Sequence, residues 1–242
     1  MSEDLLELAF AARGGRKLWN RANTLTATVH VYGEFWKFKG HGNLLGLERV
    51  TADINNQRIS MTPFGEGNTL HFDADLDLVT ITDASRGELD RLEHPRASMA
   101  GFGMETPWTS TQMGYFISYA MWTYLLVPHL FTLPGVEMRE IEPWSEDGET
   151  WRRLELTFPE SLATHSRKMI YYIDAETGLE RRMDYDAEVN GGSKVAHYTS
   201  EYADFNGLVV PRRRRVLHRD NENFGIHASS DILLDVSDVI LS

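Results

Sequence analysis

Short runs of alternating apolar and polar residues make up most of the chain, and one long uncharged stretch interrupts them. Between Glu105 and Glu137 there is no Asp, Glu, Lys or Arg, and the middle of this stretch reads GYFISYAMWTYLLVPHLF. Its large side chains recur at spacings of three and four residues, which is the spacing of one helical face. Because most of the circumference is apolar, we expect a helix that is buried on several sides and that ends or kinks at Pro128.

The alternating runs predict antiparallel strands. From Thr24 the apolar residues recur at every second position, as in a strand with one buried face. Comparable runs, separated by turns that contain Gly or Asn, cover residues 34–39, 47–53, 57–62, 69–82, 151–158 and 228–240. Two longer stretches, 167–189 and 195–220, predict hairpins with turns at Gly178 and at Asn206-Gly207. The total is about ten strands.

These elements predict an α+β fold in a single domain over residues 1–242. A first helix is expected where Ser2 can cap its start and the pair Gly14-Gly15 can end it. No linker or internal repeat divides the chain. Long hairpins with outward-facing polar residues favour a strongly curved antiparallel sheet with one face covered by helix. We expect the solvent face of the strand after Gly178 to carry a polar set, namely Arg182, Asp184, Asp186 and Glu188.

Composition and charge narrow the class of protein. The formal net charge of −12 argues against a nucleic-acid partner and against docking on anionic membranes. The absence of cysteine excludes disulfides, thiolate chemistry and Cys-ligated zinc. The unbroken apolar part of the uncharged stretch is shorter than the ~20 residues that span a bilayer, and Pro128 interrupts it, so we expect no stable membrane insertion. The N-terminal residues are acidic where a secretory leader is basic, so we expect a cytoplasmic protein.

Five stretches together resemble one known group of proteins. They are GG-x-x-x-W at 14–19, the helix at 115–131, GETWRRLELTFPESLATHS at 148–166, YYIDAETGLERRMDY at 171–185, and Y-x-x-F-x-GL-x-x-P ending at Pro211. The chain resembles an uncharacterised bacterial family related in fold to periplasmic lipoprotein carriers and lipoprotein-sorting proteins, the LolA-like superfamily. The resemblance covers most of the chain and implies an incomplete β-barrel whose helices plug a concave, apolar face that can hold acyl chains. The carriers are exported, whereas we expect a cytoplasmic protein here. Of the properties of the carriers, only the apolar cavity is therefore expected in this chain.

A run of four arginines, 212–215, is the most informative polar feature. In a strand, Arg212 and Arg214 point one way and Arg213 and Arg215 the other, and both sets have apolar neighbours. At least one pair is therefore expected on the covered side, where a guanidinium needs a carboxylate or a ligand anion. Internal pairing or a solvated edge is one interpretation. The other is a pair of arginines that holds the anionic head of an amphipathic ligand.

Other polar patterns give weaker signals. His71, Asp73, Asp75 and Asp77 alternate like the start of a calcium loop, but Leu78 and Ala84 stand where that loop needs Gly and Glu. A solvated strand face or hairpin turn is therefore favoured over a metal site. Ser161, His165 and Ser166 lie close in sequence, but there is no G-x-S-x-G motif. His165 is either a hydrogen-bonded structural histidine or a functional one.

The tyrosines of the uncharged helix need hydrogen-bond partners for their hydroxyls, so part of the helix is expected to border a polar or hydrated cavity, although a simple core remains an interpretation. We predict a protein that binds a hydrophobic or lipid-like small molecule in an apolar half-barrel cavity. The residues expected at the ligand are Tyr115, Phe116, Tyr119, Trp122, His165, Tyr185, Arg212 and Arg214. No cofactor, metal ion or catalytic residue is predicted.

Two other functions remain open. The exposed half-barrel face could bind a protein partner, as in an interaction or scaffold domain, or a second copy of the chain as a homo-oligomer. An enzyme would require polar residues, including His165, that converge at the mouth of the pocket.

Overall fold

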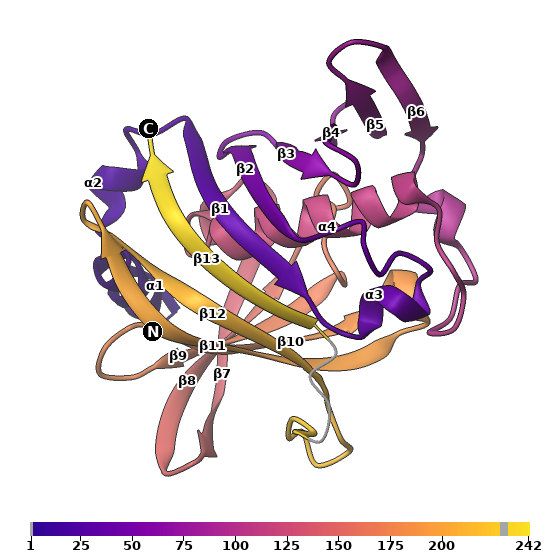
Figure 1. Cartoon of the computed structure of the whole chain (residues 1–242). Helices are drawn as coiled ribbons and strands as arrows, with labels where there is room; N and C mark the ends of the chain where they lie inside the picture. Colours follow the sequence, from indigo (N-terminus) through magenta and orange to yellow (C-terminus); the bar gives the residue numbers. More distant parts are fainter. Residues whose placement is uncertain (1, 228–231) are drawn as a thin grey trace.

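The computed structural model describes residues 2–227 and 232–242. Within this part of the chain, thirteen strands form one antiparallel sheet in the order β6-β5-β4-β3-β2-β1-β13-β12-β11-β10-β9-β8-β7. The sheet is strongly curved and stays open, so it is an incomplete barrel (Figure 1). The predicted α+β fold is confirmed, with more strands than the ten or so that we expected.

The chain builds this sheet as two meanders, which the pairing of β1 with β13 joins. The first six strands are β1 (Thr24–Tyr32), β2 (Leu47–Asp53), β3 (Arg58–Phe64), β4 (Asn68–Asp73), β5 (Leu78–Asp83) and β6 (Gly87–Glu93). The others are β7 (Glu137–Glu146), β8 (Glu149–Thr157), β9 (Lys168–Asp174), β10 (Glu180–Ala187), β11 (Ser193–Phe205), β12 (Leu208–His218) and β13 (Ile232–Leu241). The helices are α1 (Ser2–Ala12), α2 (Arg16–Trp19), α3 (Phe35–Phe38) and α4 (Ser110–Leu125). Three 3₁₀ turns complete the described part of the chain: η1 (Ala97–Met99), η2 (His129–Thr132) and η3 (Glu188–Asn190).

Helix α4 is the predicted aromatic helix, and it lies against the sheet formed by β3 to β6 (Figure 1). A capping box starts it: the Thr109 hydroxyl accepts from the Gln112 backbone N–H, and the Gln112 side chain accepts from the Thr109 N–H. Every residue after Ser110 is buried. At Gly114 a Cβ would stand 2.5 Å from Leu70 Cδ1, so glycine permits the close approach to β4. No helix in the described residues is long and apolar enough to cross a bilayer.

Helix α1 packs on the turns of two hairpins at the other side of the molecule. A Cβ at Gly178, in the β9–β10 turn, would stand 2.5 Å from the Leu8 carbonyl oxygen. A Cβ at Gly14 would stand 2.3 Å from the carbonyl oxygen of Gly207, in the β11–β12 turn. Gly14, marked in the sequence as the end of the first helix, and Gly178, marked as a turn residue, therefore also allow the backbones of the N-terminal segment and the hairpins to touch.

Three of the predicted strands differ from the structure. Residues 34–39 were expected to form a strand, but Phe35–Phe38 is the short helix α3. The residue after this helix is anchored by tertiary contacts, because the buried Lys39 ammonium donates to Gly103 O at 3.1 Å, Thr106 O at 3.2 Å and Asn190 Oδ1 at 2.6 Å. Residues 69–82 form two strands, β4 and β5, with a turn between them. Of the strand predicted for 228–240, the described part begins at Ile232, and residues 228–231 lie outside the described residues.

Candidate functional site

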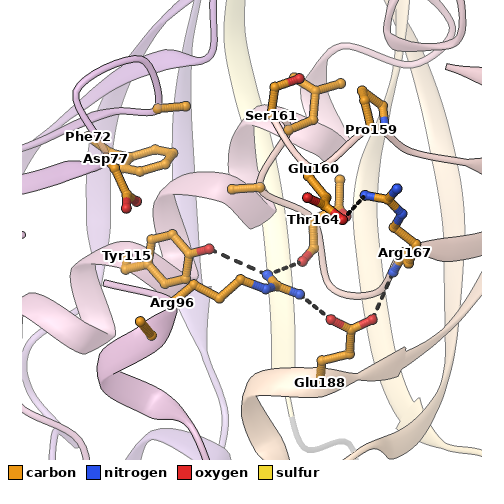
Figure 2. Close-up of a pocket in the computed structure, with 14 residues that line it drawn as sticks. Phe72, Asp77, Arg96, Tyr115, Pro159, Glu160, Ser161, Thr164, Arg167 and Glu188 are labelled. Carbon is orange, nitrogen blue, oxygen red and sulfur yellow. Dashed lines mark hydrogen bonds and ion pairs between the residues drawn. The ribbon is translucent and has the colours of Figure 1, made fainter. Parts of the chain in front are cut away.

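An open pocket of about 610 Å³ lies at the end of the half-barrel beside the start of α4. We call it the mouth pocket (Figure 2). Its walls come from the β4–β5 hairpin, the start of η1, α4, the segment between β8 and β9, and η3. The lining residues are Phe72, Ala74, Asp77, Arg96, Ala97, Tyr115, Pro159, Glu160, Ser161, Leu162, Ala163, Thr164, Arg167 and Glu188.

Arg96 organises the floor of the mouth pocket by joining three of its walls. Its Nη1 donates to the Thr164 carbonyl oxygen at 2.9 Å and to the Tyr115 hydroxyl at 3.4 Å, and its Nη2 donates to Glu188 Oε2 (Figure 2). The other oxygen of Glu188 accepts from the Arg167 backbone N–H at 2.9 Å. Burial raises the pKa of Tyr115, so the phenol is a neutral donor and acceptor in this floor.

The rest of the mouth pocket combines apolar walls with a charged rim. The apolar side consists of Phe72, Ala74, Ala97 and Leu162. At the rim, Arg167 Nη1 lies 3.9 Å from Glu160 Oε1, and both side chains are largely in water. The lining holds two arginines and three carboxylates. The pocket is therefore nearly balanced in charge and has no cationic excess for an anionic headgroup.

His165 lies under this pocket, inside a buried network of tyrosines. The Tyr124 hydroxyl lies 2.6 Å from His165 Nε2, the Tyr119 hydroxyl lies 3.3 Å from its Nδ1, and Tyr124 also bonds Tyr185 at 3.0 Å. The His165 ring stacks on Tyr185 with 4.0 Å between ring centres. Burial lowers the pKa of His165 to about 3, so the imidazole is neutral. Both ring nitrogens have partners, and the ring has no exposed surface.

The structure distributes the predicted ligand residues over several environments. Tyr115 lines the mouth pocket, while Phe116 and Tyr185 line a narrow apolar void of about 30 Å³. Tyr119 and Trp122 are fully buried, and the Trp122 indole donates to the Asp53 carbonyl oxygen at 2.7 Å. Tyr119, His165 and Tyr185 therefore share one network, and the aromatic side chains of α4 fill the space beneath the mouth pocket.

The two arginines predicted to share a face lie in different environments. Arg214 is buried, whereas Arg212 is exposed. The alternation of β12 is interrupted just before them, because Val210 and Pro211 are both buried. Arg214 donates to the Tyr124 carbonyl oxygen at 2.8 Å and lies 3.6 Å from Glu180.

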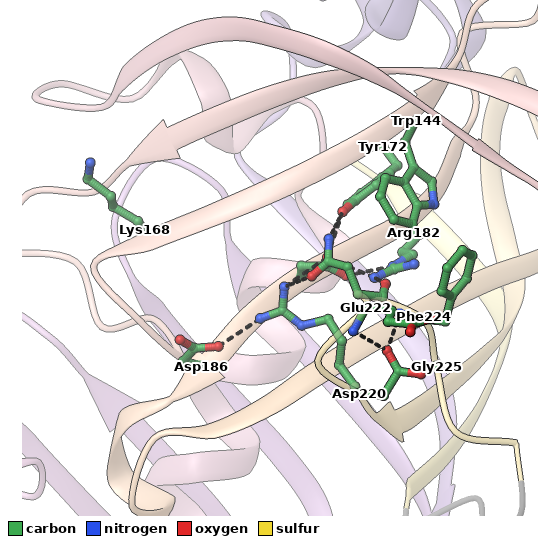
Figure 3. A network of polar contacts seen from close by, with 12 residues as sticks. Trp144, Lys168, Tyr172, Arg182, Asp186, Asp220, Glu222, Phe224 and Gly225 are labelled. Atoms are coloured by element: carbon green, nitrogen blue, oxygen red, sulfur yellow. Dashed lines mark hydrogen bonds and ion pairs between the residues drawn. The ribbon is translucent and has the colours of Figure 1, made fainter.

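The outer face of the sheet carries a second polar network (Figure 3). Arg182 and Asp184 were expected on a solvent face, and this expectation is wrong, because residues 219–227 cover them. We call this segment the strap. Arg182 donates to Asp184 Oδ1 at 2.6 Å, to Glu146 Oε2 at 2.7 Å and to the Asn223 carbonyl oxygen at 2.5 Å. The strap residue Arg219 donates to Asp184 Oδ2 at 3.1 Å.

The acidic residues after His71 are dispersed around the β4–β5 turn. Arg58 pairs with Asp73 at 2.9 Å and with Asp75 at 2.7 Å, and Asp77 lies 2.7 Å from His94. Within residues 2–227 and 232–242, no three His, Cys, Asp or Glu side chains form a group that could hold a metal ion.

Several residues of the mouth pocket carried no signal in the sequence. Arg96, Arg167, Glu188 and Phe72 are isolated residues on four separate segments, and only the tertiary structure brings them together. The segment 159–164 had one indirect signal, since it lies in a motif on which the resemblance rests. In this motif the sequence drew attention to His165, whereas the pocket is lined by the residues just before it, 159–164.

Comparisons with known proteins identify the fold. No family model matches the chain, and no curated protein matches it. A LolA superfamily protein from Nitrosomonas europaea is similar over 99% of this chain and 93% of its own, with 14% identity and a TM-score of 0.56. A domain named for outer membrane lipoprotein sorting, from Vibrio parahaemolyticus, is similar over 100% of this chain and 94% of its own, with 11% identity and a TM-score of 0.54. The chain therefore has the LolA-like fold that its motifs predicted.

The same comparison corrects the expected location. We expected a cytoplasmic protein from the acidic N-terminal residues. That expectation is wrong, because a neighbour that shares this fold is named for outer membrane lipoprotein sorting. Acidic residues at the start of a chain are a local property, and they carried less weight than the fold.

Proposed function

We propose that this protein binds a lipid-like, amphipathic small molecule in the mouth pocket. The observation that carries the proposal is the pocket itself: about 610 Å³ of open space beside a half-barrel whose described interior is filled by side chains. Ligand sites usually measure about 300–1,000 Å³ and combine apolar walls with a few placed polar groups. The neighbour named for lipoprotein sorting supports a ligand with an apolar part.

The pocket supports one orientation for such a ligand. Phe72 and Leu162 offer an apolar wall, and burial of apolar surface there contributes about 25 cal/mol per Å². Arg167 and Glu160 stand at the rim with opposite charges. In this proposal the apolar part of the ligand lies against the wall, and an uncharged or zwitterionic head lies at the rim. Of the helix residues predicted at the ligand, Tyr115 is the one that contacts it.

Filling the pocket tests the proposal. Ala97 lines the mouth pocket and is exposed, so the larger side chain of Ala97→Trp occupies the pocket without disturbing the packing of the core. The control is Ala84→Trp at the exposed β5–β6 turn. We expect the uncharged probe N-phenyl-1-naphthylamine to bind the unmodified protein and Ala84→Trp alike, and to bind Ala97→Trp at least about tenfold more weakly. Equal binding by all three proteins would place the probe elsewhere and refute the proposal.

The headgroup is tested separately with two single-chain amphiphiles. Because the lining has no cationic excess, we expect a zwitterionic lysophosphatidylcholine to displace the probe at lower concentration than a fatty acid of the same chain length does. Stronger displacement by the fatty acid would contradict the zwitterionic head while leaving the pocket as the binding site.

A further inference from the structure

Three charged side chains are buried inside the protein, away from the mouth pocket, and the charges of Glu180 and Arg214 both act on Arg13. Arg13 follows α1, Glu180 begins β10, and Arg214 lies in β12. Each is at most 3% exposed. None of them lines the mouth pocket. Their burial sets this cluster apart from the surface ion pairs of the sheet.

The hydrogen-bond donors of this cluster greatly outnumber its available acceptors. Among the described residues, none of the three Arg13 guanidinium nitrogens has a hydrogen-bond partner, and neither has Arg214 Nη1. The buried Tyr171 hydroxyl has no partner either. The acceptors left free in the cluster are the two carboxylate oxygens of Glu180 and the hydroxyl oxygen of Tyr171.

The charges of the cluster are also unbalanced. Glu180 is 3.6 Å from Arg214, but no described carboxylate lies within 4.0 Å of Arg13. Two guanidinium groups therefore share one carboxylate, which leaves one positive charge in excess. A buried charge without a partner costs several kcal/mol, because the interior cannot replace the water that the group has lost. A single negative charge next to Arg13 removes this penalty.

We propose that the cluster of Arg13, Arg214 and Glu180 is a binding site for a small monovalent anion, either chloride or a carboxylate group. The anion accepts from the Arg13 guanidinium and from Arg214 Nη1. Glu180 stays paired with Arg214 and keeps the total charge at zero when one anion is bound. The Arg13 guanidinium, held under α1, then links that helix to β12 through the anion.

Thermal unfolding at constant ionic strength tests the site with chloride alone. Replacing sodium gluconate by sodium chloride raises Tm in a saturable way, by about 5–10 °C when chloride reaches a hundred times its Kd. Arg13→Met removes the excess charge and abolishes the rise. The matched control is Arg16→Met, because Arg16 lies three residues away and is a partly exposed arginine paired with Glu7. A Tm that is independent of chloride, or an equal rise in Arg13→Met, overturns the proposal.

A crystallographic experiment uses the unmodified protein, so that it does not depend on how the Arg13 variant folds. Crystals grown in sodium bromide should show an anomalous peak within about 3.5 Å of the Arg13 guanidinium nitrogens. A parallel crystal with acetate and no halide should show a carboxylate there if that source is preferred. Water molecules alone at this position in both crystals would refute an anion site.

Discussion

Arg181 and Arg182 are neighbours in the sequence, yet the structure gives them opposite environments. The Arg182 side chain has no exposed surface, and its guanidinium lies over the rings of Tyr172 at 4.8 Å and Tyr198 at 5.4 Å. Arg181 pairs with Glu149 and Asp174 near the surface. A charge that is buried and paired is far more sensitive to loss of its partner than one in water.

We predict that Arg182→Met destabilises the protein by about 3–5 kcal/mol, because it removes the buried guanidinium that pairs with Glu146 and Asp184 and leaves Asp184 with Arg219 as its cationic partner. Arg181→Met should cost less than about 1 kcal/mol, since its ion pairs are partly solvated. Urea unfolding of both variants measures the difference. Similar losses in the two variants would show that the strap leaves Arg182 accessible to water.

At the scale of the elements, α1 depends on how closely it approaches the hairpin turns. Gly178 and Gly192 have nearly the same backbone angle, with φ of 73° and 74°. They differ in their surroundings, because a Cβ at Gly178 would meet the Leu8 carbonyl oxygen, whereas a Cβ at Gly192 has no atom within 4 Å. Alanine substitutions at these two glycines therefore separate the free-energy cost of the left-handed conformation from the free-energy cost of displacing α1.

We predict that Gly192→Ala destabilises the protein by about 1 kcal/mol, the cost of a left-handed alanine. Gly178→Ala should cost at least about 2 kcal/mol more, because backbone atoms of α1 must move. Denaturant unfolding of the two variants compares them directly. If the two losses are equal, α1 is not seated on the β9–β10 turn.

At the scale of the whole molecule, one continuous sheet includes strands from both halves of the described chain. A single domain over residues 1–242 stays a prediction.

The dependence of the protein's stability on pH is the sum of contributions from all buried titratable groups. Burial lowers the pKa of His165 to about 3 and that of His197 well below 6.5, so below pH 6.5 the unfolded chain binds protons that the folded protein does not. The folded protein therefore loses stability as pH falls, because these histidines take up protons in the unfolded chain.

Glu48 acts in the opposite direction. Burial raises the pKa of its carboxyl group to about 7, from 4.5 in the unfolded chain. Between these values the folded protein binds the extra proton, so this group adds stability as pH falls from 7 to 4.5. Each group contributes up to about 1.4 kcal/mol per pH unit, and burial also lowers the pKa of His129, so the histidines together outweigh this glutamate and leave a net loss of stability on acidification.

We predict that replacing His197 by leucine removes the contribution of this histidine to the pH dependence of the free energy of unfolding. Between pH 6.5 and 5, the free energy of unfolding of the unmodified protein should fall more steeply than that of His197→Leu, by about 1.4 kcal/mol per pH unit. The control is His30→Leu, since His30 is exposed on β1 and its replacement should leave the slope unchanged. Urea midpoints at several pH values provide both slopes. Parallel slopes for all three proteins would show that His197 is accessible to protons in the folded state.

The sequence alone determined the aromatic helix, most of the strands and the two hairpins, and the resemblance of its motifs to a known superfamily predicted the LolA-like fold. The helix, strands and hairpins depend on periodicity and turn chemistry within a few neighbouring residues. Thr24 to Val31 alternate because one face of β1 is buried, and Gly178 marks a turn because its φ is 73°. Local patterns of this kind are set by the backbone and by which face meets the core.

Only the tertiary structure decided the positions of the charged groups and of the pocket. A register shift between Glu180 and Arg182 turns Glu180 inward, although strict alternation places both on one face. The strap then covers Arg182, and Arg96 meets Thr164 and Glu188 across 68 and 92 residues of chain. The energies that place these groups come from partners distant in the sequence, so no local pattern records them.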